Sequence, residues 1–296
     1  MAIPEADLTA MATIGAQTTS KDTYATVKLA LQANDTGYAT KSYKVFLQGS
    51  YGNDTNIRKE SDVDVVIRLD SIFTYDLMSL PPEQKQAFAE AHGAATYTHT
   101  HFREDVLTAL YARFGAHVNP GTKAIMIDPF HNRRKADVLI ATQHRKYSRY
   151  MSAADESFVK GISFHKSDGT RVANYPKQHR ENMVAKNQAT NEWFKHIVRI
   201  FKNARQKLIE QRVIEAGVAP SYYLEGLLYN VPVDQFGTSY DDSMVKCINW
   251  LFAADRSKFV CANEQYKLLD GNTDVTWNTK NCDAYLNGLV GLWKGW

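Results

Sequence analysis

The chain has 296 residues, of which 44% are hydrophobic and 23% are charged, and its formal net charge is +3. This composition predicts a soluble globular protein with one large or two modest domains, and it excludes a disordered chain. The nearly balanced charge argues against a dedicated nucleic-acid coat protein, which needs a strong excess of basic residues.

Two further features bear on where the protein works. The three cysteines are too few for a disulfide framework, and their spacing gives no zinc-ligand set. The sequence has no run of about 18 apolar residues, and its first residues do not combine a basic start with an apolar stretch. We therefore expect a protein of the reducing cytoplasm, with no transmembrane helix and no membrane partner.

The first part of the chain mixes helix and strand signals. Amphipathic spacing predicts helices at 18–34, 83–91 and 101–115. Alternating or continuous apolar runs predict strands at 43–48, 62–69, 123–128, 135–142, 144–151, 158–166 and 171–175.

From Pro176 onward the pattern is helical. Helices are predicted at 191–216, 221–230, 241–255 and 279–293. The sequence therefore predicts an α+β fold. Residues 1–175 would form an N-terminal helix and a lobe built on a mixed sheet, and residues 176–296 would form a helical lobe.

The segment 46–68 carries the clearest chemical signal and reads FLQGSYGNDTNIRKESDVDVVIR. One predicted strand ends in Gly49 and Ser50, and a second begins with Asp62 and Asp64 two residues apart. Residues two apart in a strand point to the same face, so the two carboxylates repel each other unless a divalent cation lies between them. The glycine lets backbone N–H groups approach a phosphate, and a short helix starting near Ser50 would add its positive N-terminal end.

This arrangement resembles the DNA polymerase β-like nucleotidyltransferase superfamily, in which a third Asp follows on a later strand. The resemblance implies that Asp62, Asp64 and Asp137 are catalytic and hold two Mg²⁺ or Mn²⁺ ions. Asp137 fits because it lies in the apolar strand KADVLI, where a carboxylate needs a partner. Asp128 is the rival third acid, although its position before a proline is typical of a strand-end turn.

The residues around the spacer complete the expected phosphate site. By the same resemblance, Gln48, Gly49 and Ser50 bind the nucleotide, and the last two seat its triphosphate. Arg58 and Lys59, within the spacer, either touch a phosphate or lie in a solvated loop.

Residues 193–208 of the helical half read WFKHIVRIFKNARQKL. Helical spacing gathers apolar side chains on one face, namely Phe194, Ile197, Phe201, Ala204 and Leu208. The opposite face is polar and mostly basic, with Lys195, Arg199, Lys202 and Gln206. The plain interpretation of such a basic face is a solvated surface.

Together with APSYYLEGLLYNVP at 218–232, this helix resembles the cGAS/DncV-like nucleotidyltransferases, or CD-NTases. The resemblance implies that Lys202 and Ser221 contact the triphosphate and that Tyr222 stacks on a nucleobase. A cation and a hydroxyl suit phosphate oxygens, and an aromatic face suits a base. The alternatives are that Ser221 is only an N-cap after Pro220 and that Tyr222 only packs in the core.

Residues 40–235 are similar to the bacterial clade E of this family, CdnE, whose members make 3′,5′-linked cyclic dinucleotides, some of them from uridine nucleotides. The resemblance implies ATP and UTP as substrates, a role in anti-phage signalling (CBASS), and CBASS accessory proteins as partners. It also implies that Asn174 recognises uracil, because an amide can pair with an imide edge. The alternative for Asn174 is a polar strand end before the turn at Tyr175 and Pro176.

Other features separate the chain from animal cyclic GMP-AMP synthase. Its cysteines lack the spacing of that enzyme's zinc-bound insertion, and the predicted N-terminal helix carries only Lys21 and Lys28, offset by Asp22. We therefore expect no direct activation by DNA or RNA.

The remaining candidates are weaker. His99 and His101 have the spacing of a metal pair on a strand, but no third ligand is near in sequence, so we expect a surface loop. Phe73 and Tyr75 come just past the strand of the paired acids, where they either line the mouth of a cleft or only pack.

We expect the two lobes to close over a cleft that holds two nucleoside triphosphates. The 3′-hydroxyl of one would attack the α-phosphorus of the other, pyrophosphate would leave, and a second transfer would close the ring. One rival is a nucleotidyltransferase that tails RNA or modifies a protein or small molecule. The other is a non-enzymatic nucleotide-binding protein, against which the presence of all three acids argues.

Overall fold

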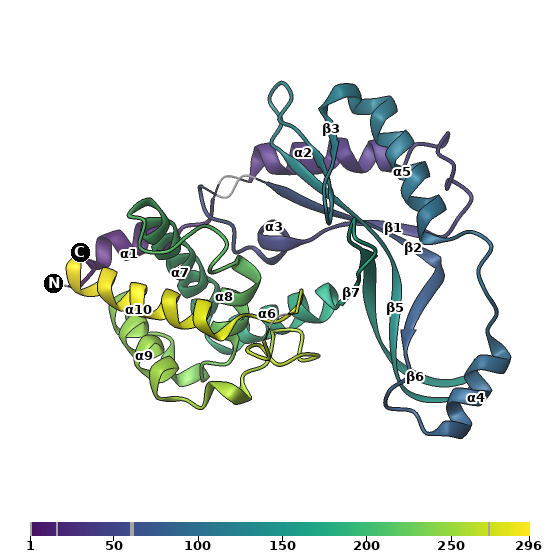
Figure 1. The fold of residues 1–296 in the computed structure, drawn as a ribbon. Helices are drawn as coiled ribbons and strands as arrows, with labels where there is room; N and C mark the ends of the chain where they lie inside the picture. The colour runs from purple at the N-terminus through teal and green to yellow at the C-terminus, as the bar shows by residue number, and fades with distance from the viewer. Residues whose placement is uncertain (1, 16, 60–61, 272) are drawn as a thin grey trace. The chain divides into compact units, whose positions relative to one another are not determined.

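The computed structural model describes residues 2–15, 17–59, 62–271 and 273–296, which form an α+β fold (Figure 1). Contacts divide the chain into two compact units. The helical unit comprises Met1–Gln17, Gly49–Glu60 and Lys177–Trp296, and the sheet unit comprises Thr18–Gln48 and Ser61–Pro176. These units differ from the expected lobes 1–175 and 176–296 in that the helical unit also includes two segments from the first part of the chain.

The sheet unit is built on one mixed sheet, in which the described residues form seven strands. Its strand order is β1-β2-β5-β4-β3, and β6 also pairs with β5 while β7 pairs with β6. Among the strands of the described residues, only the pair of β2 and β5 is parallel. The strands are β1 Tyr43–Leu47, β2 Val63–Asp76, β3 Val118–Pro120, β4 Ile125–Ile127, β5 Ala136–Ser152, β6 Asp155–His165 and β7 Arg171–Asn174.

Two strands run further than the sequence predicts. β2 continues to Asp76 past an irregularity between Leu69 and Phe73, so Phe73 and Tyr75 lie within the strand and not beyond it. β5 joins two predicted strands into one. A β-bulge lets a strand absorb a break in its alternation, and such a break in the sequence looks like a strand end.

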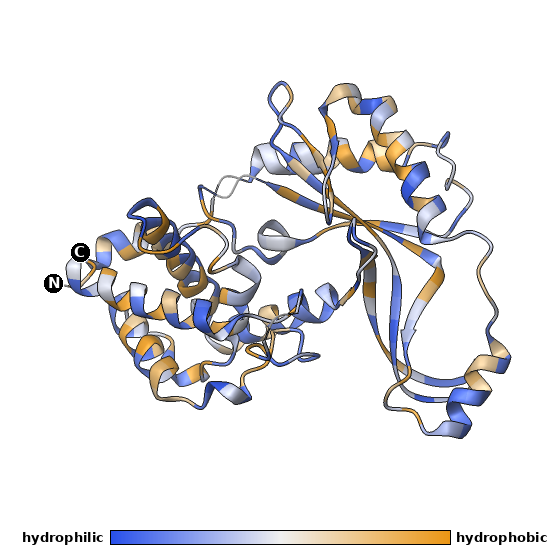
Figure 2. Ribbon diagram, in the orientation of Figure 1, coloured by the Kyte–Doolittle hydropathy of each residue, from blue (hydrophilic) through white to orange (hydrophobic). Residues whose placement is uncertain are grey.

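Two helices cover one face of this sheet: α2 (Thr18–Leu31) and α5 (His99–Phe114) lie side by side along it (Figure 1). α4 (Pro82–Ala91) packs on the other face, against the far part of β5, where Phe88 contacts Tyr147. Every second residue of β2 from Val63 to Leu69 is fully buried, whereas Asp64 and Arg68 between them are partly exposed. Hydrophobic and hydrophilic residues accordingly alternate along the strands in Figure 2, as a sheet with one covered face requires.

The predicted surface loop at His99 and His101 is wrong, because both residues belong to the first turn of α5. Thr98 caps this helix: its hydroxyl accepts a hydrogen bond from the His101 backbone N–H, and the His101 side chain accepts one from the Thr98 backbone N–H. This is a capping box in which histidine takes the place usually held by Glu or Gln.

The helical unit contains seven α-helices of the described residues, all except α2, α4 and α5. These helices are α1 Glu5–Ala12, α3 Gly49–Asn53, α6 Pro176–Ala189, α7 Trp193–Glu210, α8 Ser221–Tyr229, α9 Tyr240–Ala253 and α10 Thr279–Gly295. Short 3-10 turns occur at Gly115–His117 in the sheet unit and at Val233–Gln235 and Arg256–Lys258 in the helical unit. Sequence reasoning did not predict α1, which packs against α7 and α9.

α7 lies at the centre of the helical unit and is buried on both of its predicted faces. The apolar face fills the core as expected, but the basic face is not solvated: Lys195, Arg199 and Lys202 are 9%, 5% and 0% exposed. These cations contact the backbone and side chains of residues 50–55, which explains why Gly49–Glu60 belongs to this unit.

Two expectations about the chain as a whole can be compared with the structure. No helix in the described ranges is both long and apolar enough to cross a membrane. The cysteines Cys247, Cys261 and Cys282 are buried and free, which fits the expectation that three cysteines do not form a disulfide framework.

Candidate active site

Asp64 and the third acid lie on adjacent strands of the sheet unit, and Asp62 directly precedes the first of these strands. Asp64 on β2 is paired directly with Asp137 on the parallel strand β5. Residues directly opposite in a strand pair share a face, and Asp62 shares it because it precedes Asp64 by two positions. Asp128 lies beyond the end of β4, where its carboxylate accepts a hydrogen bond from Asn119 Nδ2 at 2.7 Å.

A lysine that the sequence analysis did not single out lies between two of these acids. Lys135 Nζ is 2.9 Å from Asp62 Oδ2 and 3.5 Å from Asp137 Oδ1. The hydrogen bond from its ammonium group to Asp62 raises the pKa of Lys135. Burial raises the pKa of Asp137, and the charge of Asp62 adds to this, while Lys135 offsets part of the effect.

This donor set fits a divalent cation. Three carboxylates supply oxygen ligands, which Mg²⁺ and Mn²⁺ prefer. Burial is the main cause of the raised pKa of Asp137, and a bound cation would offset this cost to the charged carboxylate. In the present side-chain positions no three His, Cys, Asp or Glu groups of the described residues converge on a metal point, and Lys135 is the cation that joins two of the acids.

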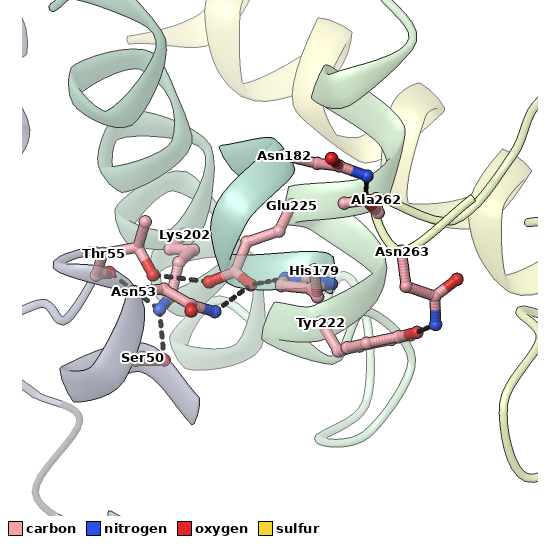
Figure 3. A network of polar contacts seen from close by, with 10 residues as sticks. All are labelled: Ser50, Asn53, Thr55, His179, Asn182, Lys202, Tyr222, Glu225, Ala262 and Asn263. Atoms are coloured by element: carbon pink, nitrogen blue, oxygen red, sulfur yellow. Dashed lines mark hydrogen bonds and ion pairs between the residues drawn. The ribbon is translucent and has the colours of Figure 1, made fainter. Parts of the chain in front are cut away.

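The expected phosphate-binding turn is present in the helical unit. Gly49 has φ 66°, a left-handed conformation that favours glycine, and it begins the short helix α3 that the sequence predicted near Ser50. Lys202 Nζ donates to Ser50 Oγ at 2.7 Å and to the Thr55 carbonyl oxygen at 2.8 Å (Figure 3). The structure thus brings together Ser50 and Lys202, two of the residues predicted to bind the triphosphate.

The rest of the basic face of α7 holds the same segment. Lys195 Nζ is 3.1 Å from Asp54 Oδ2, and Arg199 Nη1 donates to the Asp54 carbonyl oxygen at 2.8 Å. A buried cation needs such partners because leaving water is costly for a charge. Lys195 and Arg199 therefore fix the chain that follows Ser50.

Ser221 and Tyr222 open α8 in the same unit. Ser221 is the first residue of the helix, after Pro220 at the N-cap, and its Oγ accepts a hydrogen bond from Arg205 Nη1 at 3.1 Å. The interpretation of Ser221 as an N-cap is therefore wrong. The ring of Tyr222 packs at the edge of the core, and its hydroxyl accepts a hydrogen bond from Asn263 Nδ2 at 2.9 Å.

Asn174 and Gln48 belong to the sheet unit. Asn174 ends β7, as the alternative interpretation expected, and its Oδ1 accepts a hydrogen bond from the Tyr175 backbone N–H at 2.8 Å. A Cβ at Gly161 would approach the Asn174 carbonyl oxygen to 2.6 Å, so β7 can pair here only because residue 161 is glycine. Gln48 donates its backbone N–H to the Asp64 carbonyl oxygen at 2.9 Å, while its buried Oε1 has no hydrogen-bond partner among the described residues.

The strand register relates Asn174 to the acids. Asn174 pairs with Ile162 on β6, which pairs with Gln143 on β5. Gln143 is six positions from Asp137 along β5, so the two side chains point to the same face. Asn174 and the three acids therefore lie on one face of the sheet.

Of the weaker candidates in the spacer, Lys59 forms an ion pair with Glu210, and Arg58 is exposed. Residues 60 and 61, also in the spacer, lie outside the described residues.

Sequence reasoning missed Lys135, His179 and Glu225. Glu225 carried a usable signal, because it is an acid within the apolar run LEGLL, the same feature that singled out Asp137. Lys135 could have been found as the residue two positions before Asp137 on the same strand face. His179 has no comparable signal in the sequence.

A mixed sheet with three carboxylates on adjacent strands, and a Gly-Ser turn bound by a buried lysine, define a nucleotidyltransferase of the DNA polymerase β-like fold. Comparison with known proteins narrows this class. Residues 181–294 match the family model of the cGAS/DncV-like nucleotidyltransferase C-terminal helical domain. The cyclic UMP-AMP synthase of Rhodothermus marinus is 41% identical over 298 residues, covering 100% of this chain and 99% of that protein.

Other relatives agree. A cyclic dipyrimidine nucleotide synthase CdnE of Legionella pneumophila is 37% identical over 251 residues, covering 84% of this chain and 83% of that protein. The solved structure of the R. marinus CdnE c-UMP-AMP synthase with Apcpp and Upnpp has a TM-score of 0.89 and covers 99% of this chain and 97% of that chain. The solved structure of the Elizabethkingia meningoseptica CdnE cyclic dinucleotide synthase with GTP and Apcpp has a TM-score of 0.77. It is 25% identical in sequence and covers 99% of this chain and 98% of that chain.

The chain therefore belongs to the CD-NTase family, among the CdnE cyclic nucleotide synthases. The predictions of fold and family from the sequence are confirmed.

Proposed function

We propose that this protein joins two nucleoside triphosphates into a 3′,5′-linked cyclic dinucleotide and releases pyrophosphate. The observation that carries the proposal is the register that sets Asp64 opposite Asp137, with Asp62 on the same face. ATP and UTP are the proposed substrates, because the R. marinus relative is named a cyclic UMP-AMP synthase and was solved with Apcpp and Upnpp.

Each proposed site residue has a distinct task. Asp62, Asp64 and Asp137 would hold two Mg²⁺ or Mn²⁺ ions, which neutralise charge on the reacting phosphates when bound. Gln48, Gly49 and Ser50 would bind the nucleotide, and the backbone at Gly49 can come close to a phosphate because no Cβ intervenes.

The remaining tasks concern the triphosphate and the bases. Lys202 and Ser221 would add a cation and a hydroxyl to the triphosphate site, and Tyr222 would stack on a base. Asn174, on the face of the sheet that carries the acids, would hydrogen-bond to uracil. Positioning and charge neutralisation supply most of the catalysis in such transfers, because little covalent chemistry falls to the side chains.

The reaction comprises two transfers of one kind. In the first, the 3′-hydroxyl oxygen of one nucleotide attacks the α-phosphorus of the other, and the bond to pyrophosphate breaks. In the second, the free 3′-hydroxyl of the linear product attacks the remaining α-phosphorus, and a second pyrophosphate leaves. We place the cyclic product in anti-phage signalling in the cytoplasm, where CBASS accessory proteins are the expected partners.

Product analysis tests the proposal. The purified protein is incubated with the four nucleoside triphosphates and Mg²⁺ or Mn²⁺, without DNA or RNA, and the mixture is treated with phosphatase. We expect a phosphatase-resistant cyclic dinucleotide that contains uridine, adenosine or both, identified by mass spectrometry. A tailed RNA, a nucleotide-modified protein or a linear product would instead support the rival transferase.

Matched variants of the acids locate the chemistry. The double variant Asp62→Asn with Asp64→Asn, and the single variant Asp137→Asn, should fold but form no product. Asp128→Asn should retain activity, because Asp128 lies beyond its strand end and is bound to Asn119. Product from the double variant, or loss of activity in Asp128→Asn alone, would contradict the assignment of the three acids.

A further inference from the structure

One buried carboxylate in the helical unit is bound by three side chains from two separate segments, residues 53–55 and α6 (Figure 3). Glu225 on α8 is 2% exposed. Thr55 Oγ1 donates to its Oε1 at 2.5 Å, while Asn53 Nδ2 donates to its Oε2 at 3.0 Å and His179 Nε2 lies 2.7 Å from the same oxygen. A buried carboxylate is costly unless it is bound in this way, so the three donors and Glu225 hold one another in place.

The carboxylate of Glu225 is ionised at neutral pH. Burial by itself raises the pKa of a carboxyl group. The hydrogen bond and charge of His179, together with the nearby charge of Lys202 and the hydrogen bond from Thr55, outweigh burial, so the pKa of Glu225 lies below its ordinary value. Charged acceptors form stronger hydrogen bonds than neutral ones, which makes this group a firm anchor.

Through Thr55, Glu225 is connected to the proposed triphosphate site. Thr55 binds Glu225 through its hydroxyl, and its backbone carbonyl accepts a hydrogen bond from Lys202 Nζ at 2.8 Å. The same ammonium donates to Ser50 Oγ at 2.7 Å, and Lys202 is completely buried. The position of Thr55 therefore affects where Lys202 and Ser50 stand.

Through His179, Glu225 is connected to Tyr222, whose aromatic ring is proposed to stack on a base. The ring of His179 stacks on the ring of Tyr222, with centroids 4.8 Å apart and planes 19° apart. His179 Nδ1 is buried and has no hydrogen-bond partner in the described part of the chain, so Glu225 is the polar group that orients the ring. Tyr222 is three residues before Glu225 on α8, which places both on one side of the helix.

We infer that Glu225, together with His179, is a positioning residue for the nucleotide. Its carboxylate fixes the triphosphate-binding pair Ser50 and Lys202 through Thr55, and the base-stacking ring of Tyr222 through His179. The inference rests on the proposed function, which supplies the ligand of these residues. It adds that phosphate and base recognition in the helical unit depend on one group that touches neither.

Binding measurements with two probes test this inference. The probes are a non-hydrolysable ATP analogue and inorganic triphosphate, each titrated calorimetrically into the full-length protein with Mg²⁺. In Glu225→Gln, the negative charge is lost and one amide oxygen replaces two carboxylate oxygens, so the hydrogen bonds from Thr55, Asn53 and His179 cannot all be kept as they are. We expect the affinity for both probes to fall about tenfold or more, the scale of a lost hydrogen bond to a charged group.

A second variant separates the two sides. His179→Gln keeps a donor for Glu225 but removes the ring that supports Tyr222. We expect the affinity for the ATP analogue to fall about threefold to tenfold, the scale of a lost aromatic contact, while the affinity for inorganic triphosphate stays unchanged. If His179→Gln lowers the affinity for both probes equally, the division into a phosphate side and a base side is overturned.

The control variant is Tyr285→Phe. It removes a buried hydroxyl that donates to the Phe201 carbonyl oxygen at 2.9 Å in the same unit, and it leaves the Glu225 contacts intact. We expect a lower melting temperature with unchanged binding of both probes. If Glu225→Gln also loses melting temperature but binds both probes like the wild type, Glu225 is only a structural group and the inference is overturned.

The outcome for the wild type separates this inference from the proposed function. A wild-type protein that binds both probes but forms no cyclic product contradicts the proposed function, and the variants still decide the role of Glu225. A wild-type protein that binds neither probe overturns both.

Discussion

Replacing Lys135 tests how the acids are balanced before a metal binds. Its ammonium group is 2.9 Å from Asp62 and 3.5 Å from Asp137, so it stands where positive charge is needed. A divalent cation that binds these carboxylates must either displace the ammonium group or bind close to it and be repelled by its positive charge. We therefore expect Lys135→Met to bind Mn²⁺ more tightly than the wild type.

The magnitude follows from how exposed the pairs are. The side chain of Lys135 is 31% exposed, and those of Asp62 and Asp137 are 44% and 28% exposed. Solvent screens such pairs, and each is worth about 0.2–1 kcal/mol, so the two together contribute about 1 kcal/mol. A free-energy difference of about 1 kcal/mol corresponds to an approximately fivefold gain in affinity.

Electron paramagnetic resonance can measure this affinity, because the signal of free Mn²⁺ falls as the ion binds. The titration is made without nucleotide at fixed ionic strength. Lys166→Met is the matched control, since it removes a lysine of the same unit that pairs with Asp168 at 3.7 Å, outside the group of acids. Unchanged or weaker Mn²⁺ binding in Lys135→Met, relative to this control, would refute the reasoning. The metal-free melting temperature of Lys135→Met should also fall, because the carboxylates lose their counter-charge.

Two other predictions concern the sheet unit. Asn174→Ser should lower the share of uracil in the product about tenfold, because a hydroxyl cannot match both a donor and an acceptor of the base; an unchanged product ratio in mass spectrometry would remove Asn174 from base recognition. Burial lowers the pKa of His144 from 6.5 to about 4, so below pH 6.5 the unfolded chain takes up a proton that the folded protein does not, and stability falls as the pH falls toward 4. His144→Gln should lose about 3 kcal/mol less unfolding free energy than the wild type between pH 7 and pH 4 in denaturant titrations; equal losses would show that His144 does not titrate this way.

The local patterns were sufficient to predict much of the candidate site. Alternation along a strand places Asp62 and Asp64 on one face whatever the rest of the chain does, because side chains in a strand alternate by geometry. The apolar surroundings of Asp137 in the sequence indicated a carboxylate that needs a binding partner. Helical spacing likewise predicted the buried apolar face of α7, which the structure confirms.

The same local rules failed where a second segment covers a polar surface. The spacing of Lys195, Arg199 and Lys202 defines a face, but spacing does not reveal what packs against it. Residues 50–55, far away in sequence, cover this face, so the plain interpretation of a solvated surface is wrong and its cations are buried hydrogen-bond donors. For the same reason, the helical unit could not be recognised in advance as a discontinuous part of the chain.

The sequence alone therefore determined the family, the order of most helices and strands, and which side chains share a face of one element, because these follow from short-range periodicity and motif spacing. Only the tertiary structure decided that Asp64 pairs with Asp137, that Lys135 lies between two acids, and that Glu225 joins Thr55 to His179. These contacts link residues that are distant along the chain, and the choice of partner depends on the packing of whole elements and the cost of burying their polar groups.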